Sequence, residues 1–263
     1  MQSAGLLVLT TLQTVVGFEL VKPSVVYVTP TGWCAEARLD RLVHTCTEAA
    51  RGGAAMIQIR DHKADEEEIQ AATRSVRRAL EMAGCEACPV VVNGYLLDAA
   101  AAGASGVHLR ESAVREKDMD LKFFVSRCRV VLEQTTGRPA IVGCSAHSVE
   151  SVLLAAAAGV DYVQVGTMFP TATHPEKKIV EGPELVAAVL GAFAARNQPA
   201  PVLVGVGGIE DGNCAEVVKA GAHGVAVIRA IAASAAPADA VAKMRDTMAA
   251  ALSSSSSSTL PLG

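Results

Sequence analysis

The stretch AAGVDYVQVG, residues 157–166, joins an alanine-rich helix end to a short apolar strand through a glycine. Variants of this phrase occur three more times: GGAAMIQI at 52–59, AAGASGVHL at 101–109 and KAGAHGVAV at 219–227. Because glycine suits the left-handed position that ends many helices, each copy predicts a helix that is followed directly by a strand. The recurrence indicates that a strand–helix unit is repeated along the chain.

Short apolar runs, bounded by Gly or Pro, predict the strands. Eight of them occupy residues 24–29, 54–60, 89–93, 106–109, 140–145, 161–166, 201–208 and 223–228. Near-continuous apolar strands are typical of a parallel sheet that is buried on both faces, and helical periodicity fills the gaps between these strands. Eight such units over about 230 residues predict the α/β class with a single (β/α)8 TIM barrel. A doubly wound open sheet is the alternative, but the first strand–helix turn (TPTGWCAE, 29–36) lacks the G-x-G-x-x-G fingerprint of that fold.

The two ends of the chain differ in composition from its body. Residues 1–22 are mostly apolar and contain no Lys or Arg before Lys22, so they match neither a signal peptide nor a transit peptide. We expect an extra helix or strand there, with an anchor or a degenerate targeting sequence as the alternative. The barrel domain is expected over 23–252, and the serine-rich end, 253–263, is expected to be a disordered tail. Because the sequence shows no clear targeting signal, we expect a location in the cytoplasm or in the lumen of an organelle.

Composition excludes several classes of protein. A net charge of −4 and an aromatic content of 3% give neither the basic surface nor the stacking platforms of a nucleic-acid-binding protein. The body of the chain has no apolar stretch of the roughly 18 residues that a transmembrane helix needs. Seven scattered cysteines favour free thiols, and the lone C-x-x-C pair, Cys85 and Cys88, is interpreted as incidental. Alanine-rich helices are compatible with a homodimer.

Chemistry in such a barrel belongs at the carboxyl ends of the strands. Gly207 and Gly208 after the seventh strand, with Ile228 and Arg229 after the eighth, predict a phosphate cup, although a ligand-free turn is the alternative. His147 follows the fifth strand, where its imidazole could move a proton or merely pack against a helix.

Further polar side chains end other strands. Gln58 and Arg60 share the inward face of the second strand, where a buried arginine needs an anionic partner. The other binding candidates are Lys63, Asn93, Ser145, Thr171 and Thr173. In contrast, His108 and His223 are expected to be structural.

In this order, these motifs resemble the thiamine-phosphate synthase/TenI family, also called the thiamine monophosphate synthase superfamily. The matching stretches are VYVTP (26–30), MIQIRDHK (56–63), VVNGYLLDAA (91–100), AAGASGVHL (101–109), GCSAHS (143–148), AGVDYVQVGTMFPTATH (158–174), VGVGGIEDGN (204–213) and KAGAHGVAVI (219–228). The likeness covers about residues 24–232 and implies a (β/α)8 barrel. It also implies one of two activities. The synthase joins hydroxymethylpyrimidine diphosphate to thiazole phosphate with Mg²⁺ and releases pyrophosphate. The TenI-type tautomerase shifts a proton on a thiazole carboxylate phosphate, using a histidine and no metal.

This chain departs from the synthase pattern at the expected metal and pyrophosphate positions. Asn93 is followed by Gly94 where the synthase has a metal-binding Asp, and HLRESA (108–113) offers only Glu111 in place of a second Asp. The lysine after the second strand is displaced to Lys63, and His174 replaces the lysine of the PTxTK motif. Arg229 stands where the family has a small polar residue. Because Mg²⁺ needs hard oxygen ligands, these changes weaken the predicted metal site.

The resemblance therefore favours a thiazole tautomerase with His147 as the catalytic residue and no cofactor. Thiamine-phosphate synthase is the alternative, using Mg²⁺ with Glu111, Asp98 or Asp118 as displaced ligands. A second alternative is a non-catalytic regulator that binds thiazole phosphate. An unrelated phosphosugar isomerase on the same barrel is disfavoured, because no acidic base stands out at a strand end. In every version derived from the family, the partner is a small phosphorylated thiazole, with neither nucleic acid nor membrane involved.

Overall fold

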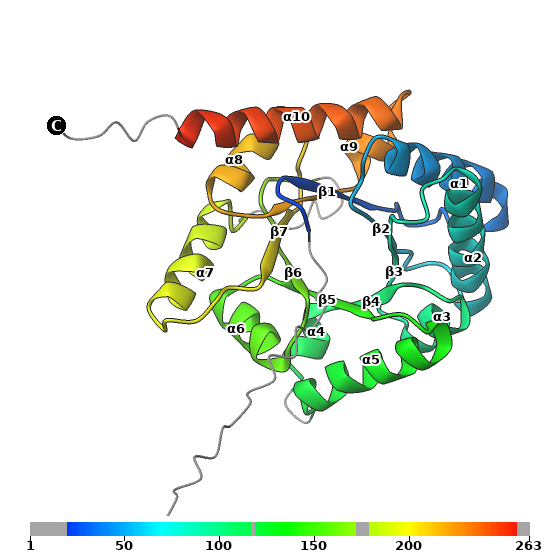
Figure 1. Ribbon diagram of the computed structural model, residues 1–263, viewed down its shortest axis with the longest axis horizontal. Coiled ribbons are helices and arrows are strands. Elements are labelled where there is room, and N and C mark those ends of the chain that lie inside the picture. Colours follow the sequence, from blue (N-terminus) through cyan, green and yellow to red (C-terminus); the bar gives the residue numbers. More distant parts are fainter. Residues whose placement is uncertain (1–19, 117–118, 172–178, 257–263) are drawn as a thin grey trace, which may run out of the picture.

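Eight parallel strands form a closed barrel in chain order, so that β8 pairs with β1 (Figure 1). The computed structural model describes residues 20–116, 119–171 and 179–256. The strands are β1 (Ser24–Val28), β2 (Met56–Ile59), β3 (Val90–Asn93), β4 (Gly106–Leu109), β5 (Ile141–Ala146), β6 (Tyr162–Gly166), β7 (Val202–Val206) and β8 (Gly224–Val227). Each strand overlaps one of the predicted apolar runs, and the predicted (β/α)8 TIM barrel is confirmed.

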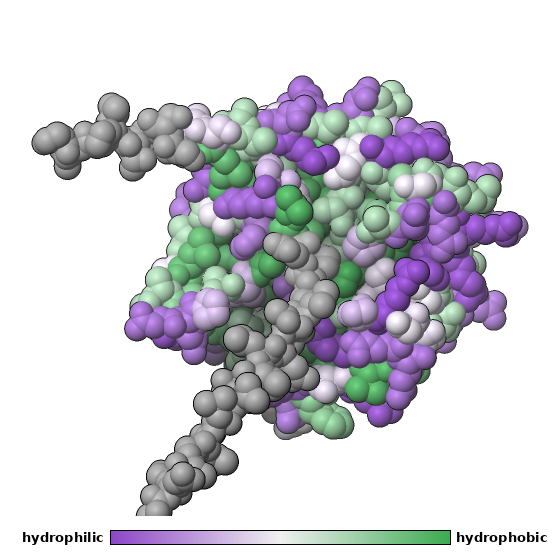
Figure 2. Space-filling view, in the orientation of Figure 1, coloured by the Kyte–Doolittle hydropathy of each residue, from purple (hydrophilic) through white to green (hydrophobic). Residues whose placement is uncertain are grey.

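Helices surround the barrel and turn their apolar faces toward it. The helices in the described ranges are α1 (Glu36–Arg51), α2 (Glu66–Met82), α3 (Leu96–Ala101), α4 (Glu111–Val114), α5 (Leu121–Thr136), α6 (Val149–Ala158), α7 (Glu184–Ala194), α8 (Cys214–Lys219), α9 (Arg229–Ala232) and α10 (Pro237–Ser256). Hydrophilic side chains dominate the outer edge formed by α1 and α2 (Figure 2). None of these helices combines the length and the apolarity needed to cross a bilayer.

Local sequence signals explain where several helices begin and end. Asp65 caps α2 through a reciprocal capping box with Glu68, and the Ser148 hydroxyl accepts from the backbone N–H of Ser151 at the start of α6. Gly159 ends α6 in the left-handed conformation, as the repeated helix–glycine–strand phrase predicts. The phrase therefore sets both the length of the helix and the entry into β6.

The last helix extends further than its sequence indicates. Helix α10 continues to Ser256, so Ser253–Ser256, which were expected to belong to the disordered tail, are helical. It packs against α8 and α1 (Figure 1). The remainder of the expected tail, 257–263, and most of the expected N-terminal extension, 1–19, lie outside the described residues. Leu20 is buried with the residues that fill the barrel interior.

The half of the barrel interior nearest the start of the strands is packed with apolar side chains. Val26, Met56, Val91, Tyr162 and Val204 point inward from five strands and are buried. The Tyr162 ring occupies space that Gly143 leaves open, since a Cβ added at Gly143 would lie 2.1 Å from the ring. This packing closes the interior at the end where the strands begin.

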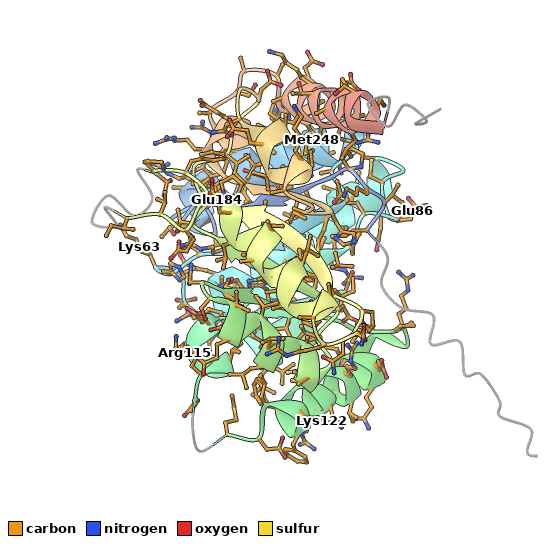
Figure 3. The ribbon with its side chains drawn as sticks, turned by 90° about the vertical axis from the view of Figure 1, so that its left-hand side faces the viewer. Lys63, Glu86, Arg115, Lys122, Glu184 and Met248 are labelled. Carbon is orange, nitrogen blue, oxygen red and sulfur yellow. The ribbon has the colours of Figure 1, made fainter. Side chains whose placement is uncertain are left out.

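Toward the carboxyl ends of the strands the inward side chains become polar. They include Gln58, Asn93, His108, Ser145 and Gln164, one from each of five neighbouring strands. In Figure 3, Lys63, Arg115 and Glu184, which follow β2, β4 and β6, lie on one side of the molecule. Glu86, which precedes β3, lies on the opposite side. The polar layer therefore opens toward a single end of the barrel.

Candidate functional site

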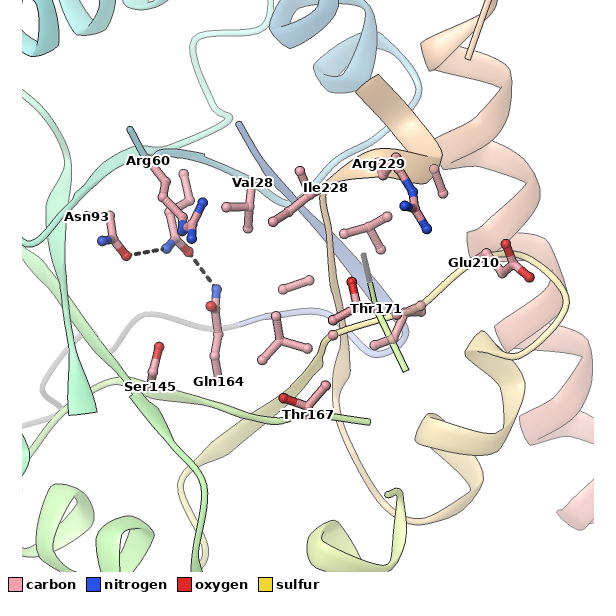
Figure 4. A pocket seen from close by; sticks show the side chains of 18 of the residues that line it. Val28, Arg60, Asn93, Ser145, Gln164, Thr167, Thr171, Glu210, Ile228 and Arg229 are labelled. Carbon is pink, nitrogen blue, oxygen red and sulfur yellow. Dashed lines mark hydrogen bonds between the residues drawn. The ribbon is translucent and has the colours of Figure 1, made fainter. Parts of the chain in front are cut away.

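A cavity of about 650 Å³ lies at the carboxyl end of the barrel (Figure 4). Most of the residues proposed from the sequence line it, namely Gln58, Arg60, Asn93, Ser145, His147, Thr171, Gly207, Gly208, Ile228 and Arg229. They come from strands that are distant in the sequence but adjacent at one rim. The barrel thus gathers the predicted residues around a single cavity.

One predicted binding residue in the described ranges, Lys63, is not among those that line this cavity. Lys63 is exposed, and its backbone N–H donates to the Asp61 carboxylate at 2.9 Å. The neighbouring residue, His62, lines the cavity instead. Thr173 lies outside the described residues, as does His174. Lys63 was predicted to bind the ligand, but its side chain is not in the cavity lining. The turn held by Asp61 places His62 there instead.

A chain of side-chain amides forms the floor of the cavity. The Nε2 of Gln58 donates to Oδ1 of Asn93 at 3.0 Å, and the Nε2 of Gln164 donates to Oε1 of Gln58 at 2.6 Å (Figure 4). All three residues are buried. Because the amides satisfy one another, their orientation is fixed before any ligand arrives.

His108 lies deeper in the barrel and has a structural role, as expected from the sequence. Its two ring nitrogens lie 3.0 Å from the Tyr162 hydroxyl and 2.8 Å from the Ser145 hydroxyl. Burial, with the positive charge of Arg60, lowers the pKa of His108 to about 3. The ring is therefore neutral at physiological pH and orients Ser145 in the cavity wall.

His147 has the geometry of a general base. Its Nδ1 donates to the Gly166 carbonyl at 2.5 Å, which leaves Nε2 with the lone pair in the neutral ring. The Glu111 carboxylate lies 4.0 Å from Nε2 and accepts the His147 backbone N–H at 2.9 Å. His147 lines the cavity. It can take a proton from a ligand at Nε2, and the carboxylate stabilises the resulting positive charge.

One end of the cavity, which we call the glycine end, consists of Gly207, Gly208, Ile228, Arg229 and Ala230. A Cβ added to Gly208 (φ +65°) would lie 2.5 Å from the Phe169 carbonyl oxygen. The backbone N–H groups of Gly208 and Ala230 find no acceptor within the described part of the chain. Free backbone donors beside an arginine suit a phosphate group.

The other end, which we call the arginine end, consists of Arg60, Gly94 and Arg110. The Nη1 of Arg60 donates to the Thr31 hydroxyl at 3.1 Å. Burial and the positive charge of Arg110 lower the pKa of Arg60. Figure 4 shows Arg60 and Asn93 on one side of the cavity and Arg229 on the other. Each end of the cavity thus presents a cationic side chain, although the carboxylates of Glu111 and Glu210 also line the cavity.

The carboxylates near the cavity do not fit a magnesium ion. Across the described ranges, no group of three or more His, Cys, Asp or Glu side chains is placed to bind a metal. One oxygen of Glu111 already accepts hydrogen bonds from the His147 backbone and the Ser151 hydroxyl. Asp98 is buried and bonded to Gln70, away from the cavity lining, so it does not serve as a displaced ligand. Asp118 lies outside the described residues.

Sequence reasoning did not select several polar residues of this site, among them Gln164 and Arg110. Gln164 points inward from β6, and the same alternation of faces that identified Gln58 would have found it. Arg110 directly follows β4 and lines the cavity. Its position was visible in the sequence, but its closeness to Gly94 depends on the pairing of β3 with β4.

Comparisons with known proteins show the family to which this chain belongs. Residues 25–231 match the family model described as thiamine monophosphate synthase. A thiamine-phosphate synthase of Natronomonas pharaonis is 36% identical over 81% of this chain and 91% of its own length. One of Methanospirillum hungatei is 32% identical over 78% of this chain and 89% of its own. The solved thiamine phosphate pyrophosphorylase of Pyrococcus furiosus superposes with a TM-score of 0.65 at 26% identity, over 87% of this chain and 96% of that one.

Proposed function

Because this chain belongs to the thiamine monophosphate synthase family, we propose that it is a thiamine-phosphate synthase, a transferase of thiamine biosynthesis. Such an enzyme joins hydroxymethylpyrimidine diphosphate to thiazole phosphate and releases pyrophosphate. The observation that carries the proposal is the similarity to enzymes of that name, which spans most of this chain and of theirs. The tautomerase preferred from the sequence has no such support from the relatives.

The two cationic ends of the cavity suit the two substrates. Thiazole phosphate places its phosphate on the free N–H groups of the glycine end, and the diphosphate of the pyrimidine faces the arginine end. In the transfer, the bond between the pyrimidine methylene and the diphosphate oxygen breaks, and the electron pair leaves with pyrophosphate. A new bond joins the methylene to the thiazole. The two rings meet above the amides of Gln58 and Gln164, whose positions are fixed by hydrogen bonds.

Magnesium is the cofactor that the synthase interpretation implies, and the relatives agree with that option. The described residues of this chain do not fit it, because they contain no group of three or more carboxylate, His or Cys side chains placed to bind a metal. Glu111 lines the cavity but is engaged with His147 and Ser151. We therefore assign no step to a metal. The charge on the leaving group is balanced by arginine side chains in this proposal.

Thiazole tautomerase is the second candidate, and one observation favours it. The Nδ1 of His147 is bound to the Gly166 carbonyl, so Nε2 is the nitrogen left to exchange a proton, and His147 lines the cavity. A single base of this kind, with an anchored phosphate, is sufficient to move a proton between two ring positions. This candidate needs no second substrate and no metal.

The two candidates are separated by assays on the purified protein. Thiamine phosphate formed from hydroxymethylpyrimidine diphosphate and thiazole phosphate supports the synthase, and each reaction is run with Mg²⁺ and with EDTA. Conversion of a thiazole carboxylate phosphate tautomer without thiamine phosphate formation supports the second candidate and overturns the first. Binding of thiazole phosphate without either turnover supports the non-catalytic regulator. The expected homodimer stays a prediction, which sedimentation of the same sample tests.

A further inference from the structure

Three neighbouring strands bring Arg60, Gly94 and Arg110 together at one rim. Ile59 pairs with Val92 across β2 and β3, so Arg60 and Asn93 follow side by side. The Gly94 backbone N–H donates to the His108 carbonyl across β3 and β4 at 2.8 Å. A Cβ added at Gly94 (φ +88°) would lie 3.2 Å from Nε of Arg110. The arginine side chain therefore lies over a position that has no side chain of its own.

Among the described residues, neither guanidinium is held in an ion pair, although burial and the charge of Arg110, which lower the pKa of Arg60, are partly offset by the charge of the Asp61 carboxylate. Across the described ranges, no carboxylate forms an ion pair with Arg60 or Arg110. Arg60 donates to the Thr31 hydroxyl, and the guanidinium carbon of Arg110 lies 5.9 Å from the centre of the Tyr95 ring. Both side chains line the cavity. Two positive groups at one rim, one of them partly buried, repel each other unless an anion lies between them.

We propose that Arg60 and Arg110 form an anion subsite that binds a diphosphate group directly, without a divalent cation. The identity of the ligand rests on the proposed synthase function, and the subsite itself rests on the geometry of β2, β3 and β4. Planar guanidinium groups bind phosphate oxygens in pairs, which gives both charge and orientation. Here Arg110 supplies, over Gly94, the positive charge that a metal ion would otherwise supply.

The same geometry disfavours a cation at this rim. A divalent ion beside Gly94 would face the guanidinium of Arg110 with no carboxylate from position 94 to offset the repulsion. Glu111, the acid nearest in sequence, is bonded to His147 and Ser151. An acid introduced at position 94 would pair with Arg110 and occupy the subsite itself.

Calorimetric titration with inorganic pyrophosphate tests the proposal. The wild-type protein is expected to bind pyrophosphate in EDTA with an affinity within about twofold of that in Mg²⁺. Arg110→Gln is expected to weaken pyrophosphate binding by about tenfold or more, as for loss of a charged hydrogen-bond donor. Arg110→Lys, which keeps the charge and loses the paired donors, should fall between them. Arg115→Gln is the matched control, because Arg115 is exposed one turn further along and does not line the cavity.

Several outcomes overturn the proposal. They are binding that requires Mg²⁺, an Arg110→Gln variant that binds as wild type while melting at the same temperature, and equal weakening by Arg115→Gln. Inorganic phosphate provides a second ligand, since it is expected at the glycine end and should not respond to Arg110→Gln. Equal weakening of both ligands indicates a general field effect and also overturns the subsite. Pyrophosphate binding through Arg110 in a protein that forms no thiamine phosphate leaves the subsite intact and removes the synthase function.

Discussion

The glycine end and the arginine end of the cavity bind anions by different means. At the glycine end the donors are backbone N–H groups, and the chain passes so close to the Phe169 carbonyl that no side chain fits at Gly208. At the arginine end the donors are the side chains of Arg60 and Arg110, which follow their strands at the rim. The glycine end is therefore set mainly by the backbone conformation after β7 and β8, with Arg229 beside it, whereas the arginine end is set by side chains.

This difference teaches where the chemistry of the barrel can vary. A site made of backbone groups persists as long as the fold does, so both candidate reactions can share it. A site made of side chains decides which second group is accepted. His147 follows β5, which lies between the two ends in strand order, and it belongs to neither of them.

The largest expected effect comes from His147→Gln. This variant tests whether His147 transfers a proton without contributing to anion binding at the glycine end or the arginine end. Loss of a general base should lower tautomer conversion by about 10²–10⁴-fold. Formation of thiamine phosphate should change by less than about tenfold, because the leaving group is stabilised by arginines and no proton has to move. Rates of both reactions are measured with each substrate saturating. A large loss of synthase turnover would show that His147 takes part in the transfer.

The second prediction concerns the rigidity of the glycine end. Gly208→Ala should weaken binding of thiazole phosphate by about 100-fold, because the loop must shift away from the Phe169 carbonyl and the free N–H groups move with it. Gly137→Ala is the control: Gly137 has nearly the same φ, +66°, but open space around it. The control should lose about 1 kcal/mol of stability and no affinity. Equal affinity losses would contradict the assignment of the phosphate to this end.

A third prediction examines the support beneath the arginine end. The pKa of His108 is lowered to about 3 in the folded protein, so between that value and its ordinary value only the unfolded chain takes up the proton. Stability must then fall as the pH drops below about 6.5. His108→Gln should remove about 1.6 kcal/mol of the difference in unfolding free energy between pH 6.5 and pH 5, measured by urea denaturation. The two proteins should have parallel pH profiles above pH 7, and parallel profiles below it would contradict the prediction.

The smallest effect is expected at the turn that leads from β2 to the cavity. The buried Asp61 carboxylate accepts backbone N–H groups of Gly32 at 2.7 Å and Cys34 at 3.1 Å. Burial raises the pKa of Asp61, but these bonds and the one from Lys63 outweigh it and hold the pKa below its ordinary value. Asp61→Asn should cost about 1.5 kcal/mol at neutral pH, and progressively less as acid protonates the wild-type carboxyl.

The exposed Asp40 on α1 gives the control for that experiment, since Asp40→Asn should stay within about 0.5 kcal/mol of wild type. Thermal unfolding at neutral and acid pH measures both variants. Equal losses at both pH values would show that the charge of Asp61 is not what holds the turn.

Much of the fold could be predicted because its signals are local. The strands are short β-branched runs, and the glycine that ends α6 stands in the repeated phrase of the sequence. The end of α10 was harder to predict, because serine is only a moderate helix former. The packing of α10 on α8 and α1 extends the helix, and the residue types of Ser253–Ser256 do not reveal that packing.

The candidate site was predictable wherever strand alternation and position at a strand end decide it. That is why Gln58, Asn93 and His147 were found and do line the cavity. Arg110 was not predicted as a site residue because its role depends on its closeness to Gly94, which the pairing of β3 with β4 produces. His62, and not Lys63, lines the cavity because of the turn around Asp61. That turn depends on the hydrogen bond from the Gly32 backbone to Asp61, which joins residues distant along the chain.

Among the described residues, the Tyr162 ring, seated where Gly143 has no side chain, helps to fill the barrel interior below the polar layer, so the cavity opens at the carboxyl ends of the strands. If one substrate lies nearer the amide floor than the other, the outer one blocks its exit, so we expect two substrates to bind in a set order. The shape of the cavity, and not only the affinity for each substrate, would then set the order of substrate binding and of product release.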